Sequence, residues 1–211
     1  MKSFKQHTID DMIYAHATDK DKQRILVDSD MFSVRADEID IPAPPANSSP
    51  ETMKDLLEVK SAVEKAEFED YNKYDKEFTD DFYALAESYG AGISLERLKT
   101  LSREVGRIVH YFKYKFNRPR PHQLADILGV EIKHQATVSG TTPAYPSGHA
   151  AQGRFLALYL SSKLPTYKED FMNLADRVAF SRIQGGVHYP SDSTTGKKLA
   201  DILFENYNEE Q

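Results

Sequence analysis

The stretch from Ser94 to Pro121 constrains the fold of this chain more than any other. Its apolar residues recur every three or four positions, which is typical of one face of an α-helix. Ser94 suits the N-cap of such a helix, and Pro119 and Pro121 stop it. The apolar face consists of Leu95, Leu98, Leu101, Val105, Ile108 and Val109. The pattern therefore predicts a long helix that buries one side.

The helical period recurs through most of the remaining sequence. We expect further helices over about 49–66, 71–89, 123–128, 148–163 and 168–183, and a last one that begins near Asp192. Strand-like alternation is nearly absent, with 130–132 as the one candidate. The predicted fold class is therefore all-α, a compact helical bundle.

We expect a single domain over residues 1–211, with 48–211 as the helical core and 1–47 as an N-terminal arm. The Pro-rich run 39–47 favours an extended connector laid over the domain, because proline biases its neighbours toward extended geometry. A disordered tail is the competing interpretation. A short helix is expected within 8–17.

The charge of the chain is unevenly spread. The formal net charge is −6, yet the segment from His110 to Asp192 holds ten Lys or Arg residues against six Asp or Glu. The overall charge argues against nucleic acid as a partner. A locally basic segment in an acidic protein favours a small anionic substrate over a long polyanion.

Other function classes are limited by what the sequence lacks. There is no cysteine, so disulfides and cysteine-based zinc sites are excluded. The longest apolar run, 155–160, is far shorter than the roughly 20 residues of a membrane span. No apolar segment follows the basic start of the chain. We therefore expect a cytoplasmic protein without a membrane span, or a periplasmic one if a leader peptide has been removed.

The first chemical motif pairs Lys113 with Arg120. Seven residues are about two helical turns, so the two cations are predicted to share a face and to bind a dianion. The arginine adds a planar fork that matches two oxygens of a phosphate. Taken alone, the segment also fits a solvated basic face, given Lys115 and Arg118 nearby.

The second motif is Pro146–Ser147–Gly148–His149, at a predicted junction of loop and helix. Backbone amides at a helix N-terminus attract anions, and Gly148 lets the backbone approach a ligand. Ser147 can donate its hydroxyl. His149, in the first turn, is placed to give a proton to a leaving oxygen. An ordinary N-cap is the alternative interpretation.

The third motif contains Arg182, His188 and Asp192. A carboxylate bound to one imidazole nitrogen fixes the tautomer, so the other nitrogen carries a lone pair toward a substrate. His188 is therefore a candidate nucleophile, and Arg182 is a third cation. Gly185 and Gly186 allow a sharp turn between them. The alternative is a loop with a capping aspartate, and Asp192 is able to serve both purposes.

Together, the three motifs resemble the signature of the type-2 phosphatidic acid phosphatase superfamily, which includes bacterial class A acid phosphatases and vanadium haloperoxidases. The family pattern is K-x6-R-P, P-S-G-H and S-R-x5-H-x3-D, and every fixed position is present here. The Pro-rich run 41–48 also resembles a segment of the class A acid phosphatases, the soluble branch. The resemblance implies the helical fold of that superfamily.

The resemblance also implies a role for each residue. His188 attacks phosphorus and becomes phosphohistidine, Asp192 orients it, and His149 protonates the leaving oxygen and then activates water. The phosphate oxygens are held by Lys113, Arg120, Ser147, Gly148 and Arg182. No metal is implied, because three cations can stabilise the transferred phosphoryl group without Mg²⁺. Vanadate is expected to bind as a phosphate mimic.

We therefore expect a soluble, metal-independent phosphatase that hydrolyses phosphate monoesters, as acid phosphatases do, and acts on a small phosphorylated substrate. A pyrophosphate or lipid-phosphate phosphatase with the same site is the alternative. A vanadate-dependent haloperoxidase, an inert phosphate-binding protein and a histidine metal site also stay open. The histidines available for such a metal site are His122, His134, His149 and His188, whose spacings match no common zinc pattern. The sequence leaves a homo-oligomer open.

Overall fold

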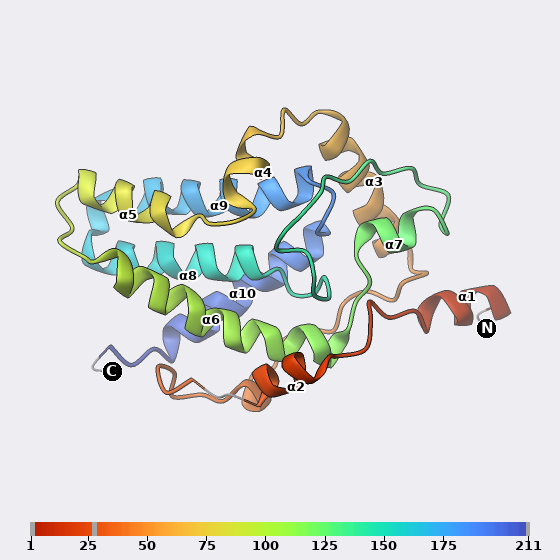
Figure 1. Cartoon of the computed structure of the whole chain (residues 1–211), viewed down its shortest axis with the longest axis horizontal. Coiled ribbons are helices and arrows are strands. Elements are labelled where there is room, and N and C mark those ends of the chain that lie inside the picture. The colour runs from red at the N-terminus through yellow and green to blue at the C-terminus, as the bar shows by residue number, and fades with distance from the viewer. Residues whose placement is uncertain (1–2, 27–28, 210–211) are drawn as a thin grey trace.

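The computed structural model describes residues 3–26 and 29–209. Its centre is α8 (Gly148–Lys163), which contacts α6 (Leu95–Phe116), α9 (Lys168–Gln184) and α10 (Pro190–Glu205). Figure 1 shows α8 between α6 and α9, with α10 crossing behind. Helix α8 buries residues all round, as expected of a helix enclosed by others. The predicted all-α class is confirmed.

Smaller elements surround this core. They are α1 (Phe4–Asp10), α2 (Asp19–Ile25), η1 (Ala36–Glu38), α3 (Pro50–Glu64), α4 (Glu69–Tyr74), α5 (Thr79–Ser88), α7 (Pro121–Ala125) and η2 (Pro165–Tyr167). Within the described residues the only β pairing is an isolated bridge between Phe32 and Tyr207, so the strand expected at 130–132 does not form. Over the same residues, no helix is both long and apolar enough to cross a membrane.

The predicted helix starts at three serines are confirmed. The hydroxyls of Ser49, Ser94 and Ser147 accept hydrogen bonds from backbone amides in the first turns of α3, α6 and α8. Each bond satisfies an amide that has no partner inside its helix. The first turns of these helices are therefore determined by local sequence.

The single helix expected over 71–89 is wrong, because the chain leaves helical geometry between α4 and α5. The Asp75 carboxylate accepts hydrogen bonds from the Val138 amide (2.8 Å) and from the Thr137 hydroxyl (2.8 Å). Glu77 then caps the next helix by accepting from the Thr79 amide at 2.7 Å. These tertiary bonds outweigh the local helical pattern and bring Asp75 to the end of α9.

Three other boundaries differ from expectation. Helix α10 begins at Pro190, two residues before the expected start, because proline suits the first helical position. Helix α7 covers 121–125 and only overlaps the expected 123–128. Of the helix expected within 8–17, only 8–10 are helical, because α1 begins at Phe4.

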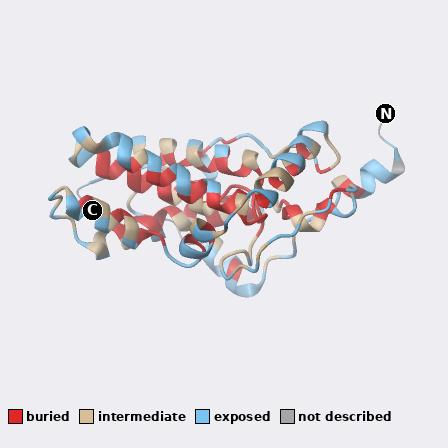
Figure 2. Cartoon of the chain, turned by 90° about the horizontal axis from the view of Figure 1, so that it is seen from above, coloured by how far each residue is buried: buried red, intermediate tan, exposed pale blue. Residues whose placement is uncertain are grey.

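The Pro-rich segment lies against the domain. Ile39 and Ile41 are buried in the main apolar core, and the carbonyl of Pro42 accepts a hydrogen bond from the Tyr145 hydroxyl. Figure 2 shows buried residues along the inner sides of the helices, whereas α1 projects from one end and is mostly exposed. The division of the chain into an N-terminal arm and a helical core stays a prediction. Residues 1–2, 27–28 and 210–211 of that division lie outside the described part of the chain.

The packing of α8 generates a stability prediction. Leu156 is fully buried, so Leu156→Ala removes buried methyl groups and leaves a cavity in the core. We expect a loss of about 2–5 kcal/mol in the free energy of unfolding, measured by urea denaturation. Leu57→Ala is the matched control, since Leu57 is 53% exposed. An equal loss of unfolding free energy in the two variants would contradict the position of α8 at the centre of the core.

Candidate active site

The three sequence motifs meet where several helices end (Figure 1). Lys113 lies in the last turn of α6, and Ser147 caps the start of α8. Arg182 lies in the last turn of α9, His188 follows that helix, and Asp192 lies in the first turn of α10. The amide of Ser147 donates to the carbonyl of Asp192 at 3.0 Å, which ties the second motif to the third.

The geometry of His188 fixes its tautomer. Its Nδ1 lies 3.0 Å from Oδ2 of Asp192, and its Nε2 lies 3.1 Å from Nη1 of Arg120. A guanidinium only donates hydrogen bonds and an ionised carboxylate only accepts them. Nδ1 therefore carries the proton, and Nε2 presents a lone pair beside the cation. This is the arrangement that a nitrogen nucleophile needs.

Asp192 both orients His188 and caps a helix. Its Oδ2 also accepts from the Tyr189 amide at 3.0 Å, at the start of α10. Its Oδ1 accepts from Nη1 of Arg118 at 2.7 Å. Arg118 is almost fully buried and stacks on the ring of Tyr189, with 3.8 Å between the guanidinium carbon and the ring centroid. The geometry thus combines the two uses of Asp192 that the sequence allowed.

Arg120 and Lys113 reach the site by a route that the sequence did not indicate. Helix α6 ends at Phe116, and Arg120 is extended at the N-cap of α7, so the expected shared helical face is wrong. Both side chains are buried, as is Arg118, which also excludes a solvated basic face for them. Loop carbonyls hold the two cations in place. Arg120 donates to Thr142 (2.8 and 2.9 Å) and Val187 (2.7 Å), and Lys113 donates to Pro143.

Arg182 is fully buried and only partly paired. Its Nη2 donates to Asp75 at 2.6 Å and to Ser139 at 3.0 Å, and its guanidinium lies over the ring of Tyr71. Its Nε and Nη1 find no partner within the described part of the chain. Buried donors without acceptors are costly, so two N–H groups beside other cations form a cradle for an anion.

The cations shift the pKa values of the groups around them. Burial, with Arg120 and Lys113 nearby, holds the pKa of His188 well below its ordinary value. Burial and the Arg182 charge lower the pKa of His149 to about 3. Burial and Arg120 also lower the pKa of Lys113. The site therefore has excess positive charge, which a bound dianion would offset.

His149 lies at the accessible edge of the cluster. It is half-buried, like Gly148, whereas the other six predicted site residues are buried. Its Nε2 donates to the carbonyl of Tyr74 at 3.0 Å, so Nδ1 is the nitrogen left to exchange a proton. The placement of His149 in the first turn of α8 is confirmed.

The turn between Arg182 and His188 requires its glycines for different reasons. Gly186 has a φ of +72°, in the left-handed region that glycine adopts without strain. A Cβ at Gly185 would lie 2.0 Å from the ring of Tyr71, the same ring that lies under Arg182. A Cβ at Gly148, by contrast, would lie 3.6 Å from its nearest neighbour, which is ordinary van der Waals contact.

Sequence reasoning missed Arg118 and Asp75. Arg118 looks like the exposed Lys115 three residues earlier, and nothing local marks it as buried. Asp75 lies inside an apparently continuous helical pattern. The histidine metal site that the sequence left open does not assemble, because the described residues contain no group of three His, Asp or Glu side chains that could hold a metal. His122 and His134 instead stack on each other, with ring centroids 4.4 Å apart.

The low pKa of His149 predicts a pH-dependent stability. Above pH 6.5 the ring is neutral in both the folded and the unfolded chain, so its full contribution is present. As the pH falls below 6.5 the unfolded chain binds the proton first, and stability falls until about pH 3. The slope is at most about 1.4 kcal/mol per pH unit for one histidine.

We therefore expect His149→Gln to lose less stability than the parent protein between pH 6.5 and 5, measured by urea denaturation without phosphate. His16→Gln is the control, since His16 is exposed. Parallel pH profiles for the parent and His149→Gln would contradict the prediction.

Comparisons with known proteins agree with the helical fold and with the motifs. A family profile described as the PAP2 superfamily matches residues 101–200. A search of the curated proteins finds no match. A solved structure described as the first bacterial vanadium-dependent iodoperoxidase aligns with a TM-score of 0.63 and 19% identity, over 81% of this chain and 53% of that one. This chain thus spans about half the length of that protein, and the similarity is one of fold.

A second structure is described as the first transmembrane PAP2-type phosphatidylglycerolphosphate phosphatase, from Bacillus subtilis. It aligns at 19% identity over 75% of this chain and 85% of that one, with a TM-score of 0.49. The segment matched by the family profile contains all three motifs, from Lys113 to Asp192. The resemblance seen in the sequence is confirmed, because the profile of the PAP2 superfamily matches the segment that holds these motifs.

Proposed function

We propose that this chain is a phosphatase that hydrolyses phosphate monoesters through a phosphohistidine at His188, without a metal ion. One observation carries the proposal. Asp192 accepts the hydrogen bond from Nδ1 of His188, so the lone pair on Nε2 faces Arg120. The buried Arg182 lies beside them, and two of its donor nitrogens have no partner among the described residues. Nucleophile and phosphate cradle therefore lie together in one desolvated place.

In the first step, Nε2 of His188 attacks phosphorus while the bond from phosphorus to the leaving oxygen breaks. The leaving oxygen keeps the electron pair and takes a proton from Nδ1 of His149. Arg120, Arg182 and Lys113 stabilise the charge on the other phosphate oxygens. Asp192 accepts the hydrogen bond from Nδ1 of His188 as that ring gains positive charge.

In the second step, water replaces the leaving group. Neutral His149 takes a proton from the water, whose oxygen attacks phosphorus from the vacated side. The bond from phosphorus to Nε2 breaks, and the electron pair returns to His188. Inorganic phosphate is released, and both histidines regain their starting states. His149 thus acts as the acid in one step and the base in the other.

The required protonation states predict a bell-shaped pH profile. His188 must be neutral and His149 protonated together, although burial and the neighbouring cations lower the pKa of both. Bound phosphate offsets the cations and raises the pKa of His149 toward the working pH. We expect kcat for p-nitrophenyl phosphate, which reports the substrate-bound enzyme, to rise and then fall when it is measured from pH 4 to 8 with EDTA.

Substitution of the histidines separates their roles. His188→Ala is expected to abolish turnover of every phosphate ester, because no nucleophile remains. His149→Ala should lower kcat by about 10²–10⁴, and more for an alkyl phosphate than for p-nitrophenyl phosphate, whose leaving group needs less protonation. A rate near that of the parent in either variant would refute the role assigned to that histidine.

Asp192→Asn tests the tautomer. The asparagine side chain can donate to Nδ1, which would move the ring proton to Nε2 and remove the attacking lone pair. We expect kcat to fall by about 10³–10⁴, as when a buried aspartate that orients a catalytic histidine is neutralised, with a small change in KM. The thermal midpoint of the variant must be measured in parallel, since Arg118 also depends on Asp192. A KM effect without a kcat effect would contradict the orienting role.

Vanadate-dependent halide oxidation is the second candidate function. Orthovanadate has the charge and shape of the transferred phosphoryl group, so the same cradle fits it, and the iodoperoxidase of similar fold is vanadium-dependent. The discriminating assay supplies vanadate, hydrogen peroxide and iodide. Iodide oxidation that requires vanadate, in a protein with no phosphatase activity, would favour this candidate. Tight phosphate binding without either activity would indicate an inert binding site.

A further inference from the structure

A cavity of about 340 Å³ opens beside His149. Its lining combines three cations, Lys76, Lys99 and Arg103, with one carboxylate, Glu77, and the polar side chains of Thr79, Ser102 and Gln152. Phe78 is the one large apolar side chain in this lining, and its ring centroid lies 5.2 Å from that of His149. The cavity is therefore polar and positively charged.

The proposed chemistry places the leaving group in this cavity. The leaving oxygen must come within hydrogen-bond reach of His149, because that residue gives it a proton. Lys113, Arg120, Arg182 and His188 are buried, whereas His149 lines the cavity. The phosphoryl group that is transferred thus lies inward, and the rest of the substrate lies outward along the cavity.

The positive charge of the cavity is only partly neutralised. Lys76 is exposed, and it has no ion pair or hydrogen bond within the described residues. Lys99 pairs with Asp80 at 3.0 Å, whereas Nε of Arg103 lies 3.9 Å from Glu104 and its Nη2 donates to the Thr100 hydroxyl at 3.0 Å. The carboxylate of Glu77 accepts from two backbone amides at the start of α5. Lys76 and Arg103 are therefore the cations most available to a ligand.

The positive lining continues beyond the cavity. Arg103 also borders a neighbouring hollow of about 410 Å³, lined by Arg24, Arg107 and His110. Gly106 lines this second hollow and Gln152 lines the first. A Cβ at Gly106 would lie 3.1 Å from the side-chain nitrogen of Gln152, so the two hollows adjoin there. In this second hollow Arg107 pairs with Glu104 at 3.4 Å and His110 lies 3.3 Å from Asp21, so Arg103 and Arg24 are its less neutralised cations.

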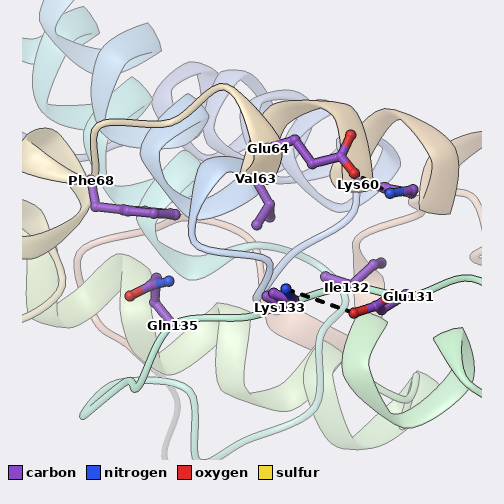
Figure 3. A pocket seen from close by; sticks show the side chains of 8 residues that line it. All are labelled: Lys60, Val63, Glu64, Phe68, Glu131, Ile132, Lys133 and Gln135. Carbon is purple, nitrogen blue, oxygen red and sulfur yellow. Dashed lines mark hydrogen bonds and ion pairs between the residues drawn. The ribbon is translucent and has the colours of Figure 1, made fainter.

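Another cavity lacks this character. The one in Figure 3, about 320 Å³, lies between the end of α3 and the 131–135 loop. Its two lysines are each paired, Lys60 with Glu64 and Lys133 with Glu131, and none of the predicted site residues lines it. It has no excess charge to attract an anion.

We propose that the leaving group of the substrate carries a second phosphate group, which Lys76 and Arg103 bind in the cavity beside His149. The inference rests on the proposed phosphatase function and specifies its substrate class. The class comprises phosphoanhydrides, such as inorganic pyrophosphate, and esters with a further phosphate on the alcohol. In pyrophosphate the bond from the attacked phosphorus to the bridging oxygen breaks, and His149 protonates that oxygen. A neutral alcohol or an acyl chain would leave the cations without partners.

Kinetics of charge-removing variants test this substrate class. We compare kcat/KM for pyrophosphate, a sugar bisphosphate and p-nitrophenyl phosphate in the parent protein, Lys76→Met and Lys76→Met/Arg103→Gln. Loss of each cation should lower kcat/KM about fivefold for a substrate with the second phosphate, since a charge-assisted hydrogen bond is lost. The value for p-nitrophenyl phosphate should change less than about twofold. Lys198→Met is the matched control, because Lys198 is exposed on α10 and lines neither hollow.

The two phosphorylated substrates separate the sources of the second phosphate. A selective loss on pyrophosphate alone assigns an anhydride, and a selective loss on the bisphosphate alone assigns an ester; either supports the proposal. Equal losses on all three substrates would place the cations on the transferred phosphate and overturn it. Unchanged kinetics on all three would overturn it as well.

A binding experiment tests the second phosphate site independently of the proposed phosphatase activity. Methylenediphosphonate, which cannot be hydrolysed at its bridge, should bind more tightly than methylphosphonate in isothermal titration calorimetry, and the double variant should lose that gain. Equal affinities in the parent protein would overturn the second phosphate site even if p-nitrophenyl phosphate is hydrolysed. Absence of any turnover with the affinity gain intact would instead refute the phosphatase assignment alone.

Discussion

The Asp192 carboxylate is the contact on which the active-site geometry depends. Oδ2 accepts hydrogen bonds from Nδ1 of His188 and from the Tyr189 amide at the start of α10, and Oδ1 accepts from the buried Arg118. The backbone carbonyl of Asp192 also receives the amide of Ser147, the residue that caps α8. A single residue thereby fixes the candidate nucleophile, two helix starts and a buried cation. Both oxygens of its charged group have hydrogen-bond donors, which is the condition for burying a carboxylate at little cost.

The rest of the site is less fully paired. Lys113, Arg120 and Arg182 are buried together, and the donors Nε and Nη1 of Arg182 have no acceptor within the described part of the chain. Asp75 offsets one cation, and its pKa falls to about 2: burial opposes that fall, but hydrogen bonds from the Val138 amide and Thr137 and the Arg182 charge outweigh it. The remaining excess charge is unfavourable in a buried place and favours the binding of a dianion. The packing of helix ends around α8 holds these cations together despite their mutual repulsion.

Much of the fold is local in origin. Ser49, Ser94 and Ser147 cap helices within their own first turns, and the spacing of apolar residues predicts the long helices around α8. The pairing of His188 with Asp192 is also local, since they are four positions apart at the start of α10. These features depend on bonds between residues that are neighbours in the sequence, so periodicity and motif spacing predict them. The resemblance to the PAP2 superfamily rests on the same short motifs.

Other features depend on contacts between distant residues. The break between α4 and α5 arises because Asp75 bonds to the 137–139 loop and to Arg182, which no pattern near residue 75 reveals. Arg118 and Lys115 look alike in the sequence, yet only Arg118 is enclosed by Asp192, Tyr189 and Asp55. Lys113 and Arg120 converge through a loop rather than along a helix face. Most of the helices, the resemblance to the PAP2 superfamily and the candidate reactive residues could thus be predicted from the order of amino acids. Which cations are buried and which donors stay unpaired could not, because burial and pairing depend on what distant parts of the chain bring to each side chain.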